Sequence, residues 1–67
     1  MIVVNGSETD APAGERLSAV LARLGVSAQA RGVAVAVDGE VVPRARWESV
    51  TLEDSSHVEV LSAMQGG

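Results

Sequence analysis

The most unusual chemical feature of this sequence is the pair of glycines that closes the stretch SAMQGG. Glycine has no Cβ and the greatest backbone freedom, so Gly66 and Gly67 are unsuited to packing or capping an element. One interpretation is a frayed end, as is common at chain termini. The other is a functional tail whose only reactive group is the terminal carboxylate. The choice between them depends on what precedes the pair.

Other reactive side chains are scarce. The 67 residues include no Cys, which excludes a disulfide, a thiolate metal site and a cysteine nucleophile. His57 is the single histidine, and the absence of Lys excludes Schiff-base catalysis. The carboxylates lie mostly in expected turns or beside polar residues, as solvated surface groups do. We therefore expect no enzyme activity and no cofactor or metal bound by the chain itself.

The formal charge is −4, and the five basic residues are all Arg, scattered from Arg16 to Arg46. A nucleic-acid-binding protein needs a basic stripe to displace counterions from phosphates, and this chain lacks one. The first residues show neither the basic start and apolar run of a signal peptide nor a membrane span. We expect one cytoplasmic domain that binds neither nucleic acid nor membrane.

Two strand pairs are expected, each joined by a tight turn. The β-branched run 2–4 precedes Asn5-Gly6, and the valine-rich run 33–37 precedes Asp38-Gly39; both dipeptides favour two-residue hairpin turns. The return strands are expected at about 7–11 and from residue 40 to 42. The last strand is expected at 57–63, with a single turn near 44–48 and a possible short strand at 50–52.

A helix is expected at residues 15–24. Leu17, Val20, Leu21 and Leu24 follow the i, i+3, i+4, i+7 spacing of one apolar stripe. Glu15 in the first turn and Arg23 in the last would favour the helix dipole, and Gly25 suits the position after the helix, although the N-cap is poor. One helix among these strands predicts an α+β fold, a mixed sheet of about four to five strands packed on one helix.

This order of elements and the terminal Gly-Gly resemble the ubiquitin-like β-grasp fold, and more narrowly the ThiS family of sulfur carriers in bacterial thiamin-thiazole biosynthesis. The residues that carry the resemblance are IVVNG, VAVAVDGEVVPRARW and VEVLSAMQGG. The chain departs from the family at turns, with Asp38 where Asn is frequent and EDSS where Asp-Gly-Asp is usual. The implied organisation is a β-grasp domain at 1–63 and a flexible tail at 64–67.

The resemblance implies a protein carrier, not an enzyme. An E1-like adenylating enzyme would use ATP and Mg to activate the Gly67 carboxylate, a persulfide sulfur donor would convert it to a thiocarboxylate, and thiazole synthase would receive the sulfur. Gly66 would let the tail pass into a closed site. In a β-grasp sheet, Val35, Val37, Val58 and Val60 would face the helix, and Ala34, Ala36, Glu59 and Leu61 would form a docking face. Trp47 would cover the open end of the core.

Two alternatives stay open at this stage. The same chemistry serves molybdopterin synthesis, cysteine synthesis and tRNA thiolation, for which other small β-grasp carriers with Gly-Gly tails exist. The chain could also be a β-grasp interaction module that undergoes no reaction, in which case Gly66 and Gly67 would be an ordinary frayed end.

Overall fold

The computed structural model describes residues 1–27, 29 and 31–62. The expected boundary between domain and tail, with Gly66 and Gly67, lies outside the described residues. The strands are β1 (Ile2–Val4), β2 (Ser7–Thr9), β3 (Val33–Val37), β4 (Glu40–Val42) and β5 (His57–Ser62), with helix α1 (Leu17–Arg23) and a 3₁₀ turn at Arg44–Arg46. The expected α+β class is confirmed.

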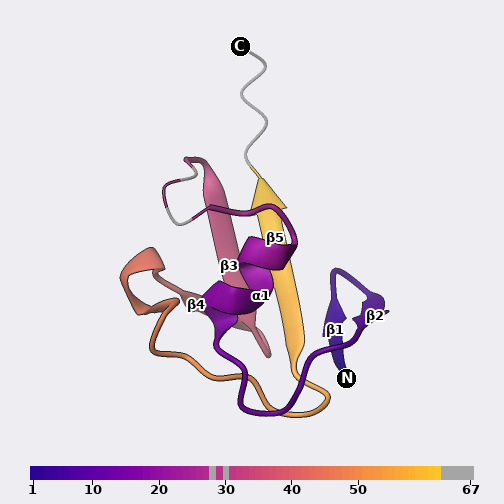
Figure 1. The fold of residues 1–67 in the computed structure, drawn as a ribbon. Helices are drawn as coiled ribbons and strands as arrows, with labels where there is room; N and C mark the ends of the chain where they lie inside the picture. The colour runs from indigo at the N-terminus through magenta and orange to yellow at the C-terminus, as the bar shows by residue number, and fades with distance from the viewer. Residues whose placement is uncertain (28, 30, 63–67) are drawn as a thin grey trace.

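The five strands form one mixed sheet in the order β2-β1-β5-β3-β4. The last strand of the sequence therefore lies in the middle of the sheet, parallel to β1 and antiparallel to β3. Helix α1 lies across one face of the sheet, over β3 and β5 (Figure 1). This placement leaves the opposite face of β3 and β5 without a helix.

Both predicted hairpin turns are present. Asn5 and Asp38 each have φ of 50°, and the glycines that follow them have φ of 85° and 86°. Positive φ at both central residues is the type I′ geometry, whose twist matches that of the flanking strands. Each turn sets the register of its hairpin, so that Val4 pairs with Ser7 and Val37 with Glu40. The return strand β2 ends at Thr9, earlier than expected.

The helix starts two residues later than expected, at Leu17. The reason is a tertiary contact: Arg16 is extended and forms an isolated antiparallel bridge with Thr51. The segment before Thr51 also compensates for the poor N-cap. The Leu17 and Ser18 amides donate to the carbonyls of Val50 and Trp47 at 2.8 and 3.0 Å. The possible strand at 50–52 is limited to this one bridge.

The helix ends in a Schellman motif at Gly25. The Val26 amide donates to the Leu21 carbonyl at 2.8 Å, the Gly25 amide donates to the Ala22 carbonyl at 3.1 Å, and Gly25 has φ of 84°. Leu24, which we expected on the apolar stripe, is 43% exposed. It is the C-cap residue, where the chain is already turning away from the core.

The core lies between α1 and the sheet. Its buried members are Ile2, Val4, Ala11, Leu17, Val20, Leu21, Val35, Trp47, Leu52 and Val58, with Val37, Val42 and Val60 half-buried against them. Trp47 has the structural position that we predicted: it is 3% exposed, and its Nε1 donates to the Val42 carbonyl at 3.0 Å. The Arg44 guanidinium lies over the Trp47 ring, 5.4 Å from its centroid.

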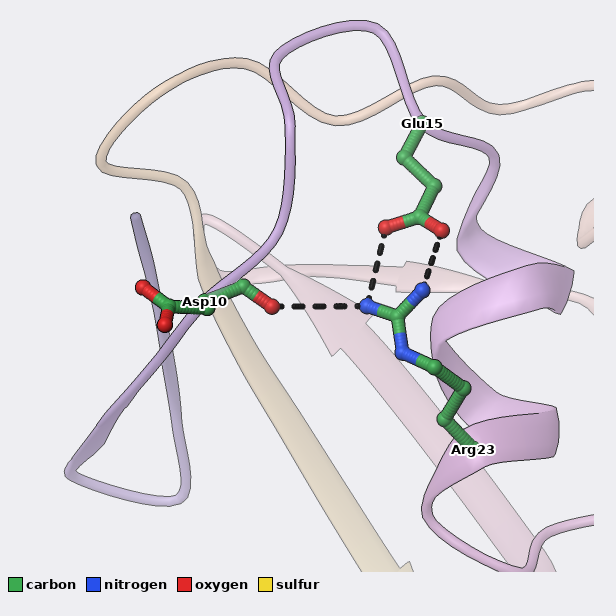
Figure 2. A network of polar contacts seen from close by, with 3 residues as sticks. All are labelled: Asp10, Glu15 and Arg23. Atoms are coloured by element: carbon green, nitrogen blue, oxygen red, sulfur yellow. Dashed lines mark hydrogen bonds and ion pairs between the residues drawn. The ribbon is translucent and has the colours of Figure 1, made fainter.

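A polar network joins the end of α1 to the segment that leads into it (Figure 2). Arg23 donates from Nη1 to Oε2 of Glu15 and from Nη2 to Oε1 at 2.9 Å, and Nη2 also reaches the Asp10 carbonyl at 3.4 Å. Glu15 precedes the helix, so the expected contact with the helix dipole is replaced by this bidentate pair. Hydrogen bonding and charge from Arg23 lower the pKa of the Glu15 carboxyl.

A lowered pKa sets the sign of a pH effect. The contribution of the pair to stability is complete above the ordinary Glu pKa of about 4.3 and is lost as the pH falls through the lowered pKa of the folded state. The urea midpoint of Glu15→Gln should therefore lie below that of the unmodified chain at pH 6, and the gap should close toward pH 3. Glu48→Gln, at an exposed residue outside this network, is the control. A gap that persists unchanged at pH 3 would contradict this assignment.

Candidate functional site

Strand β5 presents one set of side chains to the core and the other to the uncovered face. Val58 is buried and Val60 half-buried under the helix, whereas Glu59 and Leu61 are exposed. This is the period-two alternation of a strand in a sheet that is covered on one side only. The predicted division of β5 into a core face and an open face is confirmed.

The register brings the four predicted docking residues together. Leu61 lies opposite Ala34, and Glu59 lies opposite Ala36, on adjacent strands of the open face. Val41 of β4 lies on the other side of Ala36. Leu61 is 64% and Val41 73% exposed, which are the two highest values among the large exposed hydrophobic residues of the described chain. We call Ala34, Ala36, Val41, Glu59 and Leu61 the open-face strip.

Val41 is absent from the docking residues that we predicted. The signal was present, because a two-residue turn at Asp38-Gly39 places residue 41 opposite residue 36. The sequence predicts residues 40–42 as one return strand, a prediction that does not by itself assign Val41 and Val42 to opposite sides of the sheet. A valine this exposed and opposite Ala36 extends the apolar part of the open-face strip beyond β3.

The strip carries one charge, from Glu59. Among the described residues, ion pairs join the Met1 amine to Asp54, Arg23 to Glu15, and His57 to Asp38 at 4.0 Å when the histidine is protonated. Glu59 takes part in none of these pairs. Its partner on β3 is Ala36, whose side chain is a single methyl group. The Glu59 side chain is exposed at the surface.

Strand β5 leads directly toward the C-terminal glycines. Its last residue is Ser62, which pairs with Val33 next to a shallow depression lined by Gly32, Ala34 and Leu61. Gly67 follows five residues later in the sequence. An extended segment of that length spans at most ~17 Å. The open-face strip thus lies beside the point at which the described chain ends.

No metal site and no membrane segment emerge from the described part of the chain. Residues 1–27, 29 and 31–62 contain no group of three His, Cys, Asp or Glu side chains arranged to hold a metal ion. No helix within these residues is long and apolar enough to cross a membrane.

Comparisons with known proteins place the chain in a family. A sequence model described as the ThiS family matches residues 2–67. The crystal structure of a thiamine biosynthesis protein (ThiS) from Geobacter metallireducens is 37% identical, with 98% of this chain and 97% of that chain covered and a TM-score of 0.75. The solution structure of a thiamine biosynthesis protein from the same organism is 35% identical, with coverages of 98% and 86% and a TM-score of 0.76.

A search of curated proteins gave no match. The family match nevertheless spans nearly the whole sequence, and the crystal and solution structures, which are of the same Geobacter metallireducens target, share the fold over almost all of this chain. The mixed sheet with one helix agrees with the β-grasp architecture that the sequence predicted. The chain therefore belongs to the ThiS family and has a ubiquitin-like β-grasp fold.

Proposed function

We propose that this chain is a sulfur carrier of thiamin biosynthesis that acts through its C-terminal carboxylate. The observation that supports this most strongly is the position of β5, which lies in the middle of the sheet, contributes Glu59 and Leu61 to the open-face strip and ends five residues before Gly67 in the sequence. The family match and the similar thiamine biosynthesis protein, solved both as a crystal and in solution, support the pathway. The absence of Cys from the sequence leaves the terminal carboxylate as the group to which sulfur can be attached.

The proposed reaction consists of adenylation, sulfur transfer and delivery, and other proteins catalyse all of these steps. An adenylating enzyme binds Mg-ATP, the Gly67 carboxylate attacks the α-phosphorus, and pyrophosphate leaves. The terminal sulfur of a persulfide donor then attacks the acyl carbon and displaces AMP, and a thiol cleaves the resulting S–S bond to leave a thiocarboxylate. Thiazole synthase accepts that sulfur. The chain's part is to present Gly67 and to dock.

The open-face strip is the proposed docking surface. Ala34 and Ala36 keep its centre low, Leu61 and Val41 provide apolar area at its sides, and Glu59 adds one negative charge. Exposed apolar side chains grouped on one face are typical of protein contact sites. We propose that the adenylating enzyme covers this strip while the tail enters its active site, where Gly66 passes without a Cβ contact.

Leu61→Ser tests the docking surface. Because Leu61 is 64% exposed, the change should alter the free energy of unfolding by less than ~0.5 kcal/mol. Burial of a leucine at an interface is worth ~1.5–3 kcal/mol, so the dissociation constant with the adenylating enzyme should rise about tenfold or more. Leu24→Ser is the matched control, since Leu24 is exposed at the end of α1. Equal effects of the two substitutions on binding would contradict the docking proposal.

Deletion of Gly67 tests the reactive group. It moves the carboxylate back by ~3.5 Å, and a misplacement of ~1 Å already costs ~100-fold in rate. ATP–pyrophosphate exchange by the adenylating enzyme should therefore be lost, while binding of the carrier is retained. Gly66→Val should also abolish ATP–pyrophosphate exchange, because a β-branched side chain would obstruct an enzyme channel shaped for bare backbone. Exchange at the unmodified rate with the deleted chain would contradict the assignment of Gly67 as the residue that is adenylated.

A further inference from the structure

Asn5 makes more contacts with β5 than its place in a hairpin turn requires. Its main-chain amide donates to the Val58 carbonyl at 2.9 Å. Its side chain then bonds both main-chain groups of Val60: Oδ1 accepts from the Val60 amide at 2.9 Å, and Nδ2 donates to the Val60 carbonyl at 3.3 Å. The side-chain amide of Asn5 thus pairs with β5 in the way that another strand residue would.

This pairing occurs where β1 stops. The β1–β5 ladder ends with Val4 opposite Val58, but β5 continues to Ser62 and keeps its bonds to β3 throughout. Beyond Val58, β5 would therefore be an edge strand on its β1 side (Figure 1). The Asn5 side chain satisfies both groups of Val60 on that side, at the point from which the chain continues toward Gly67.

We propose that Asn5 is a positioning residue for the C-terminal tail. Its amide holds the end of β5 in line, so that the tail enters the adenylating enzyme from a fixed origin. This inference rests on the proposed function. Ordering the backbone of one residue costs roughly five- to thirtyfold in an equilibrium constant. Without the Asn5 bonds to Val60, the backbone at the end of β5 would have more freedom. Each adenylation would then carry the cost of ordering that backbone before Gly67 could reach the reactive phosphate.

The second hairpin provides a matched contact at the other end of the same strand. Asp38 has the same φ of 50°, and its Oδ1 accepts a hydrogen bond from the His57 amide at 2.9 Å. Asp38 therefore holds the first residue of β5, and Asn5 holds Val60, two residues before its last. Glycine suits positive φ at both positions, so Asn5→Gly and Asp38→Gly each remove the side-chain bonds while the type I′ turn is kept.

The experiment compares these two variants with the unmodified chain in adenylation by the adenylating enzyme. We expect Asn5→Gly to lower kcat by about tenfold with little change in the dissociation constant, because the open-face strip is intact. Asp38→Gly should keep the unmodified kcat. Asn5→Asp keeps the acceptor for the Val60 amide but loses the donor to its carbonyl, and it should fall between Asn5→Gly and the unmodified chain.

A second readout needs no enzyme. Amide hydrogen exchange at Val60 should accelerate in Asn5→Gly and stay unchanged in Asp38→Gly, although each variant loses side-chain hydrogen bonding to β5. A merely structural role for Asn5 predicts that kcat follows global stability equally in the two variants, and that result would overturn the inference. If the unmodified chain is not adenylated at all, the proposed function itself fails, and the positioning role fails with it.

Discussion

The structure depends on hydrogen bonding along both edges of β5. This strand is last in the sequence and central in the sheet, with β1 on one side and β3 on the other. Because it pairs with β1 on one side and with β3 on the other, β5 joins the two hairpins into one sheet. The Asp38 side chain completes the pairing at the start of β5, and the Asn5 side chain completes it near the end.

The same strand connects stability to the proposed function. Its alternate side chains serve two purposes: Val58 is part of the core under α1, and Leu61 is part of the open-face strip. A shift of one residue in the pairing would exchange these two sets, so the register that builds the core also builds the strip. A domain of this size has a small core and a limited reserve of stability. The proposed carrier role fits a compact domain in which one strand contributes both to the core and to the open-face strip.

Local signals predicted much of this arrangement. Asn5-Gly6 and Asp38-Gly39 identified both hairpins, and the alternation around Val58 identified which face of β5 is open. The errors arose where distant segments decide the local structure. The helix begins at Leu17 because the preceding residue pairs with Thr51, a contact that no helical periodicity reveals. The role of Asn5 was also hidden, since its side-chain partner lies 55 residues away.

We propose that sulfur is carried on the carboxyl group of Gly67. The most direct test is the intact mass of the chain after incubation with a ThiS-family adenylating enzyme, Mg-ATP and inorganic sulfide, which displaces AMP from the acyl adenylate without a redox step. We expect the exchange of one oxygen for one sulfur, dependent on ATP and located in the C-terminal fragment. An unchanged mass in the presence of active enzyme, or sulfur located elsewhere in the chain, would contradict it.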